Sequence, residues 1–178
     1  MRRALILLTA MVVALAVCGG VAYPNDHQPP EKPFLYKGEQ KLQKGRPQAS
    51  CWISPPKPNG TYFGECLDYA TSYPDVDRVV AGSRLRIRVL KSQKPKTFRV
   101  AAWRRLDKNG IPVGRGRRLA SSLTPVVRDG KTVAWDVFFR AKRPGRHYYV
   151  SASGVWDDAE IENEEQDASW NFHVKTRN

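Results

Sequence analysis

The stretch Arg84-Leu85-Arg86-Ile87-Arg88-Val89 alternates strictly between arginine and an aliphatic residue. Side chains along a β-strand point to opposite faces in turn, so a strand here places its aliphatic residues on one face and its arginines on the other. The pattern predicts a half-buried strand with a row of arginines that faces water.

Similar short segments follow. Residues 97–103 are rich in Phe, Val and Trp, and Asp107-Lys108-Asn109-Gly110 is a turn signal. Asp129-Gly130 predicts a hairpin. Its second arm and the last two expected strands place these residues on inner faces: Val133, Trp135, Val137, Phe139, Tyr148, Val150, Ala152, Trp170, Phe172 and Val174. Five or more short strands between turns predict an all-β fold, a β-sandwich over residues 74–178.

Two motifs resemble parts of immunoglobulin-like domains. Residues 79–83, Val-Val-Ala-Gly-Ser, look like the entry into the second strand of such a domain, and residues 144–150 look like the turn and penultimate strand. Tyr148 stands in the tyrosine-corner position. Over roughly residues 74–176 the chain resembles the fibronectin-type and bacterial immunoglobulin-like antiparallel β-sandwiches. The resemblance implies an adhesive, spacer or ligand-binding module.

The aromatic residues divide into two groups. One group falls on the inner phase of the expected strands and should pack in the core: Trp103, Trp135, Phe139, Tyr148, Trp170 and Phe172. The other group, Trp52, Tyr62 and Phe63, allows two interpretations. We favour burial against the edge of the sandwich, and an aromatic patch that binds sugars is the alternative.

Residues 1–22 have the pattern of a signal peptide. A positive start, Met1-Arg2-Arg3, precedes an apolar run from Ala4 to Val17 that only Thr9 interrupts. This run fits the apolar region of about 7–15 residues in a signal peptide and is shorter than the roughly 20 residues of a membrane-spanning helix. The pattern predicts export to a bacterial-type cell envelope or beyond.

The end of this segment leaves three outcomes open. Leu15-Ala16-Val17-Cys18 resembles a bacterial lipobox, which implies a lipid on the Cys18 thiol and a membrane anchor, although Val17 departs from the small residue usual before the cysteine. Gly20-Val21-Ala22 suits ordinary signal-peptide cleavage. An uncleaved anchor is the third alternative. We expect the lipid anchor.

Residues 23–48 are Pro-rich and polar, and we expect an extended tether there. Removal of Cys18 from the count of free thiols leaves Cys51 and Cys66. An even pair in an oxidising compartment predicts a disulfide. The bond would close an N-terminal extension over residues 49–73.

The chain carries 30 Lys and Arg against 17 Asp and Glu, a formal net charge of +13. Such a surface attracts anions, and arginine suits bidentate contacts with phosphate or carboxylate. We expect an anionic wall polymer or glycan as the partner and, because of export, no nucleic acid. A merely solvated surface is the alternative. The candidate anion-binding residues are Arg84, Arg86, Arg88, Arg115, Arg117, Arg118, Arg140, Arg143 and Arg146.

An acidic segment interrupts the basic domain between the last two expected strands. Its carboxylates are Asp157, Asp158, Glu160, Glu162, Glu164, Glu165 and Asp167. Clustered oxygens could hold Ca²⁺, although the spacing matches no EF-hand loop, and docking of a partner is another hypothesis. We favour a solvated loop that folds back on the basic surface, because its carboxylates repel one another without a counter-charge.

His147 and His173 occupy the outward phase of two expected strands. They could meet across the sheet and bind a metal, or one could act as a base. We favour two ordinary surface histidines. No cofactor is expected, and calcium is the one alternative.

These features predict a non-enzymatic, lipid-anchored envelope protein that presents a structural or adhesive domain. The alternative is a secreted accessory module that binds carbohydrate or calcium through its end loops. An enzyme is the weakest hypothesis, because the sequence shows no nucleophile elbow, phosphate loop or zinc spacing.

Overall fold

The computed structural model describes residues 29–54, 59–60, 63–120, 122–157 and 165–178. These parts of the chain form strands, turns and loops with no helix, so the predicted all-β class is confirmed. The strands are β1 (Phe34–Lys37), β2 (Gln40–Lys44), β3 (Arg46–Ser54), β4 (Phe63–Asp68), β5 (Asp77–Val80), β6 (Arg84–Val89), β7 (Thr97–Trp103), β8 (Arg117–Ala120), β9 (Leu123–Arg128), β10 (Lys131–Arg140), β11 (His147–Asp157) and β12 (Glu165–Arg177).

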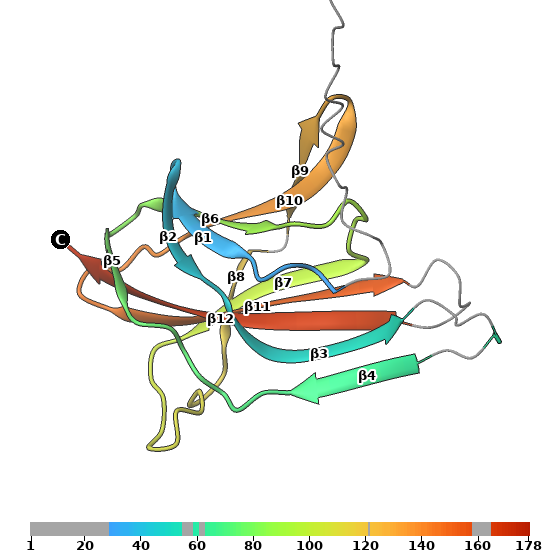
Figure 1. Ribbon diagram of the computed structural model, residues 1–178. Helices are drawn as coiled ribbons and strands as arrows, with labels where there is room; N and C mark the ends of the chain where they lie inside the picture. The colour runs from blue at the N-terminus through green and yellow to red at the C-terminus, as the bar shows by residue number, and fades with distance from the viewer. Residues whose placement is uncertain (1–28, 55–58, 61–62, 121, 158–164) are drawn as a thin grey trace, which may run out of the picture.

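The strands form two sheets, which Figure 1 shows as two layers. One sheet has five strands in the order β2-β1-β6-β10-β9. The other has seven strands, with the order β4-β3-β12-β11-β7-β8 and with β5 added alongside β12. All pairings are antiparallel except that of β5 with β12, which is parallel.

The core lies between the two sheets and follows the alternation in the sequence. Leu85, Ile87 and Val89 on β6 are fully buried, as are Val150 on β11 and Phe172 on β12. All five belong to a single apolar cluster. Burial of apolar area contributes roughly 25 cal/mol per Å², so this shared face fixes which side of each strand points inward.

The predicted turns also form. Asp129 and Gly130 join β9 to β10 with φ values of 50° and 73°. Two consecutive positive φ values are typical of the type I′ turn of a two-residue hairpin. Gly145 has a φ of 64° and turns the chain from β10 into β11. The Asp107–Gly110 turn is closed by a hydrogen bond of 3.1 Å from the Gly110 N–H to the Asp107 carbonyl.

The expected tether over residues 23–48 differs from the structure in its second half. Residues 34–37 and 40–44 form the β1–β2 hairpin, and β1 pairs with β6 in the core. Leu35 is fully buried. Leu42 also packs against the core, and the Gln43 side chain bonds both backbone groups of His173. These few side chains and the backbone pairing hold a segment whose composition suggested an extended linker. Residues 23–28 of the expected tether, and the signal segment before them, lie outside the described residues.

The predicted disulfide between Cys51 and Cys66 is present. The two cysteines lie directly opposite each other on β3 and β4, so the bond fastens β4, the last strand of the seven-stranded sheet on that side. Trp52 beside it is 6% exposed, and its ring centroid lies 5.7 Å from that of Trp156. Burial of Trp52, the favoured interpretation, is thus confirmed. Tyr62 lies outside the described residues, as does the side chain of Phe63.

Trp103 is a correction to the predicted core. On β7 the buried residues are Phe98, Val100 and Ala102, and Trp103 therefore falls on the opposite, outer face. Its indole N–H donates to the Gly114 carbonyl at 3.1 Å. A Cβ atom added to Gly116 would lie 2.5 Å from the Trp103 ring. The ring thus packs under the β7–β8 loop, outside the core.

We expect Gly154→Ala to destabilise the protein, because a Cβ atom there would lie 2.5 Å from the Trp156 ring and 2.9 Å from that of Phe98. Trp156 is fully buried and has little room to move. Overpacking of this kind typically costs about 1–3 kcal/mol. Urea unfolding measures the change, with the exposed neighbour Ser153→Ala as control. Equal stability of the two variants would contradict the packing described.

Candidate anion-binding site

The row of arginines predicted on β6 does face outward, but Arg88 is already engaged. It donates two hydrogen bonds of 2.8 Å to Asp136, from Nε to Oδ1 and from Nη2 to Oδ2. Asp136 lies directly opposite on β10 and is 5% exposed. These bonds are the main cause that raises the pKa of Arg88 above its ordinary value. Arg88 is a structural residue and not a free anion ligand.

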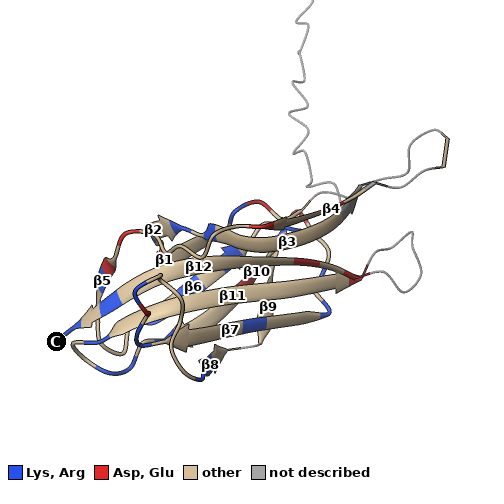
Figure 2. Cartoon of the chain, turned by 90° about the horizontal axis from the view of Figure 1, so that it is seen from below, with Lys and Arg blue, Asp and Glu red and all other residues tan. Residues whose placement is uncertain are grey.

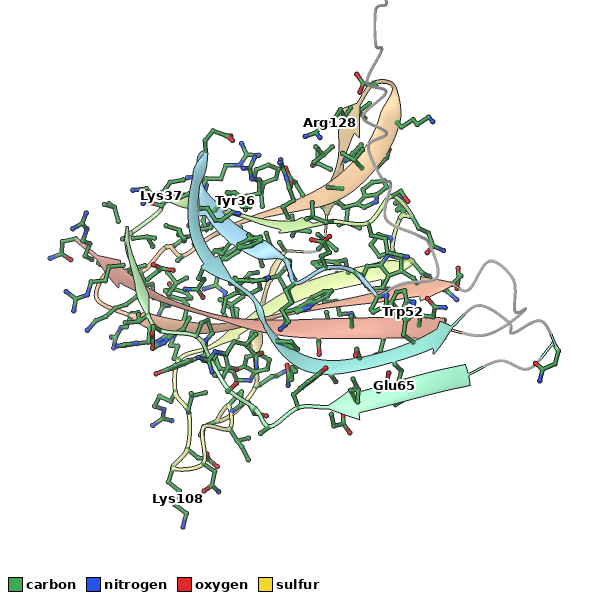
Figure 3. All side chains as sticks on the ribbon, in the orientation of Figure 1. Tyr36, Lys37, Trp52, Glu65, Lys108 and Arg128 are labelled. Atoms are coloured by element: carbon green, nitrogen blue, oxygen red, sulfur yellow. A yellow bond between two sulfur atoms is a disulfide. The ribbon has the colours of Figure 1, made fainter. Side chains whose placement is uncertain are left out.

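Arg86, the middle member of the row, is almost covered. Its side chain is 11% exposed, and its Nη1 atom lies 3.7 Å from an Asp136 oxygen and 3.5 Å from Glu39. Its guanidinium carbon is 4.6 Å from the centroid of the Tyr36 ring, a cation–π contact. Tyr36 is labelled on β1 in Figure 3. The neighbouring Arg84 stacks on Phe138 at 3.9 Å. This face therefore balances much of its own positive charge.

The other six predicted arginines are exposed and are spread over several segments of the fold. Arg140 donates to the Gly82 carbonyl at 2.8 Å. Arg118 lines a shallow hollow with Lys94, Lys96 and Arg99. The nine candidates therefore do not form one patch. Arg117 lies on β8, Arg115 lies just before it, and Arg143 lies in the turn before β11. Arg146 lines a separate pocket.

A pocket of about 310 Å³ gathers positive charge from two loops. Arg104, Arg105, Gly145, Arg146 and His147 line it. The three arginines are exposed, and no ion pair between described residues involves any of them. Because none of the described residues that line it is a carboxylate, the pocket concentrates positive potential in a small concave volume.

Arg104 and Arg105 follow β7 at the base of a stiffened loop. The Arg105 carbonyl accepts from the Val113 N–H at 3.0 Å, and the Asp107 N–H donates to the Ile111 carbonyl at 2.8 Å. The Asp107 carboxylate accepts from two further backbone N–H groups, those of Asn109 and Ile111, at 2.8 and 2.9 Å. The loop is thus a small hairpin that holds both arginines at the end of the sheet.

Arg146, in the turn before β11, and His147, the first residue of β11, also line the pocket. The Arg146 N–H donates to the Thr176 hydroxyl at 3.0 Å, and the Arg146 carbonyl accepts from the Thr176 N–H at 2.9 Å. Thr176 is 1% exposed on β12. Arg146 is therefore anchored at both backbone groups while its side chain reaches solvent. Figure 2 shows Lys and Arg near this end of β12, where the C-terminus lies, and Asp and Glu at the far ends of β11 and β12.

His147 and His173 do meet across the sheet. The His147 Nδ1 atom lies 2.9 Å from the His173 Nε2 atom. The Tyr149 ring stacks on His173 with a centroid distance of 4.4 Å, and the Tyr73 ring meets Tyr149 edge-on at 5.2 Å. Within the described residues no group of three or more His, Cys, Asp or Glu could hold a metal ion. The two histidines, Tyr149 and Tyr73 form a cluster of stacked rings with a hydrogen bond between the imidazoles.

Burial and neighbouring titratable groups shift the pKa values of His147, His173 and Tyr73. Desolvation, and secondarily the charge of Lys175, lowers the pKa of His147. Desolvation and His147 lower the pKa of His173, and a hydrogen bond to the Pro74 backbone opposes that shift. Burial, with a contribution from Tyr149, raises the pKa of Tyr73 to about 12. The two imidazoles therefore favour their neutral forms near pH 7.

The acidic segment is described only at its two ends, because residues 158–164 lie outside the described residues. Asp157 and Glu165 face each other on β11 and β12, and the Lys96 Nζ atom bridges them at 3.1 and 2.7 Å. The Asp167 carboxylate accepts from the Cys51 N–H at 3.0 Å. A lysine thus supplies the counter-charge to two of these carboxylates; the calcium and partner-docking hypotheses for the segment stay untested.

The predicted signal peptide and Cys18 also lie outside the described residues. In the part of the chain that is described, no helix is long and apolar enough to cross a membrane. Comparisons with protein-family models, with curated proteins and with solved structures found no match.

Sequence reasoning missed the pocket as a unit. Of the three pocket arginines, only Arg146 is among the predicted anion-binding residues. The grouping depends on the pairing of β7 with β11, in which Trp103 lies opposite Tyr149. Arg104 and Arg105 directly follow β7, Arg146 directly precedes β11, and His147 begins β11. That position was the one available signal.

Asp136→Asn should lower the free energy of unfolding by about 2–3 kcal/mol. Loss of one partner of a fully buried ion pair typically costs about 3–5 kcal/mol, and the cost should be smaller here because Arg88 is partly exposed. The change leaves Arg88 and Arg86 without their shared carboxylate. Glu39→Gln is the matched control: its side chain also contacts Arg86 but is 91% exposed, so the loss should stay below about 0.5 kcal/mol. Urea unfolding compares them, and equal losses would contradict the structural role of Asp136.

The lowered histidine pKa values predict that stability falls on acidification. Because both folded-state pKa values lie below the unfolded value of about 6.5, their contribution is complete above that pH and is lost as the pH falls through it. The free energy of unfolding should therefore drop between about pH 7.5 and about pH 5.5, above the range where most carboxylates titrate. His173→Gln should flatten this slope, and an unchanged slope in the variant would contradict the assignment.

Proposed function

We propose that this chain is an exported, non-enzymatic envelope protein that contacts anionic envelope polymers through the pocket of Arg104, Arg105, Arg146 and His147. The observation that carries the proposal is the composition of this pocket: three arginines from two anchored loops, with no carboxylate among the described residues that line it. Guanidinium groups bind phosphate and carboxylate oxygens in pairs of parallel hydrogen bonds. An anionic ligand would supply the negative charge that pairs with these three arginines.

The proposed scaffold is an immunoglobulin-like sandwich. The neighbours β6, β10 and β9 in one sheet and β7, β11 and β12 in the other agree with the two sheets of that architecture. The Tyr148 hydroxyl accepts from the Arg143 N–H at 3.0 Å, five residues upstream, as in a tyrosine corner. The β1–β2 and β3–β4 hairpins would then be additions at the N-terminal side. Such a scaffold supports a binding role by analogy only.

Export and a lipid at Cys18 complete the proposal. The support is the charged and apolar pattern of residues 1–22 together with the Cys51–Cys66 disulfide, because disulfides persist in oxidising compartments outside the cytoplasm. A lipid anchor would hold the protein at the membrane among envelope polymers, where a weak electrostatic contact gains from high local concentration.

The test is co-sedimentation of the purified full-length protein with cell-wall material that carries anionic polymer, over a salt series from about 50 mM to about 500 mM. Binding should fall steeply as salt rises, because contacts with a polyanion release counterions. The variant Arg104→Gln/Arg105→Gln/Arg146→Gln should lose at least about tenfold in affinity at low salt.

A charge-matched control is Lys32→Gln/Lys37→Gln/Arg128→Gln, which also removes three positive charges. Lys37 and Arg128 lie on β1 and β9, far from the Lys108 loop beside the pocket (Figure 3). This control should retain binding within about twofold. Absence of binding at every salt concentration would overturn the proposal, and so would an equal loss in the two triple variants.

A further inference from the structure

We propose that one chain of a linear phosphate polymer binds across the strands at the basic end of the seven-stranded sheet and occupies two adjacent pockets at once. The first, the arginine pocket, is that of Arg104, Arg105, Arg146 and His147. The second, the edge pocket, is that of Arg78, Lys175, Thr176 and Arg177. This inference rests on the proposed function, and it adds a second set of binding residues, the direction of the polymer and a requirement for length.

The edge pocket has a volume of about 200 Å³ and lies where β5 runs alongside the end of β12. Three cations line it, and none of the described residues in its lining is a carboxylate. Arg78 and Arg177 are exposed, and Lys175 is half-buried. No ion pair between described residues involves any of the three. Their charge is therefore open to an external anion, as it is in the arginine pocket.

The acid next to Arg78 in the sequence does not neutralise this pocket. Asp77 precedes Arg78 on β5, so its side chain lies on the opposite face of the strand. Asp77 pairs with Val174, which is fully buried on the inner face of β12. Its carboxylate accepts a hydrogen bond of 2.6 Å from the Gln43 amide. The carboxylate is thus held away from the outer face on which Arg78 lies.

A cross-strand pair joins the two pockets. Lys175 of the edge pocket lies directly opposite His147 of the arginine pocket in the pairing of β12 with β11. On its other side, Lys175 pairs with Arg78 of β5. Residues that pair directly point to the same face of a sheet. Arg78, Lys175 and His147 therefore form a row that crosses three strands on one face.

The row continues into the arginine pocket. Trp103, at the end of β7, pairs with Tyr149 on the other side of β11, and Arg104 and Arg105 follow it into the pocket lining. Neighbouring strands lie about 4.8 Å apart, so the line from β5 to β7 is about 14 Å long at the backbone. A single phosphate group cannot span this distance. A chain of several phosphates can, and it would run perpendicular to the strands.

The basic hollow at the other end of β7 suits a polyanion less well. Its cations are Lys94, Lys96, Arg99 and Arg118. Lys96 already bridges Asp157 and Glu165, at 3.1 and 2.7 Å, and these carboxylates would repel a polyanion. Figure 2 shows the same contrast, with Asp and Glu at these ends of β11 and β12 and with Lys and Arg near the C-terminus. The electrostatic attraction therefore favours the end that carries the two pockets.

The rings beside the row favour a polymer without bases. Tyr149 stacks on His173 at 4.4 Å, and Tyr73 meets Tyr149 edge-on at 5.2 Å. These rings pack against one another, whereas single-stranded nucleic acids gain affinity when their bases stack on protein rings. An acidic peptide would have to order a long side chain for each bound carboxylate, which costs rotamer entropy. A phosphate polymer carries its charge in the backbone and needs neither contribution.

Calorimetric titration of the full-length protein with tripolyphosphate and with long-chain polyphosphate tests the requirement for length. Tripolyphosphate is shorter than the row and can occupy one pocket at a time. The long chain can occupy both, and the second contact then forms at a high effective concentration. The long chain should therefore bind at least about a hundredfold more tightly than tripolyphosphate at low salt.

The variant Arg78→Gln/Lys175→Gln/Arg177→Gln tests the edge pocket. It should lose at least about tenfold in affinity for the long chain but stay within about threefold for tripolyphosphate, because the arginine pocket remains. The slope of log affinity against log salt for the long chain should become shallower by about two, since each phosphate contact of a single strand contributes about 0.7. Arg78→Gln/Arg177→Gln, which changes exposed residues alone, should show at least about a fivefold loss and separates binding from any effect on folding.

A matched control removes three clustered cations at the other hollow: Lys94→Gln/Arg99→Gln/Arg118→Gln. It should keep its affinity for the long chain within about threefold and keep the salt slope. An equal loss in this control and in the edge-pocket variant would overturn the inference, as would equal affinity for the two polyphosphates. Tighter binding of polyglutamate or of single-stranded DNA, at equal charge, would contradict the choice of a phosphate polymer.

The proposed function and this inference can fail separately. If the edge-pocket variant binds the long chain as the wild type does, while co-sedimentation with wall material still depends on Arg104, Arg105 and Arg146, the inference fails and the proposed function stands. If neither pocket affects binding to polyphosphate or to wall material, both fail.

Discussion

The requirement that both sheets give one face to a shared apolar core determines the rest of the structure. Leu85 and Ile87 of one sheet and Val150 and Phe172 of the other are fully buried. Once these side chains point inward, the alternation of a strand fixes every outward position as well. The outward positions of β6 then hold its arginines, and those of β11 and β12 hold His147, Tyr149 and His173.

The two sheets differ in how their exposed arginines are paired with negative charge. On the five-stranded sheet, Arg88 and Arg86 share the buried Asp136 and a tyrosine ring. Removal of an uncompensated charge from water is expensive, and this face provides the compensation within the protein. At the end of the seven-stranded sheet, by contrast, the pocket arginines have no ion pair with a described residue. An external anion would therefore bind more strongly at the pocket than at β6, because the pocket arginines are not already paired with carboxylates of the described residues.

Short-range patterns could be predicted, and long-range pairings could not. The β6 alternation, the Asp129–Gly130 turn and the Cys51–Cys66 bond each depend on a few neighbouring residues or on cysteine count, and all three are confirmed. The strands at residues 34–44 were missed because only a few side chains, Leu35, Leu42 and Gln43, anchor them in a polar segment. The ion pair between Arg88 and Asp136 depends on the β6–β10 register, which no local sequence pattern specifies.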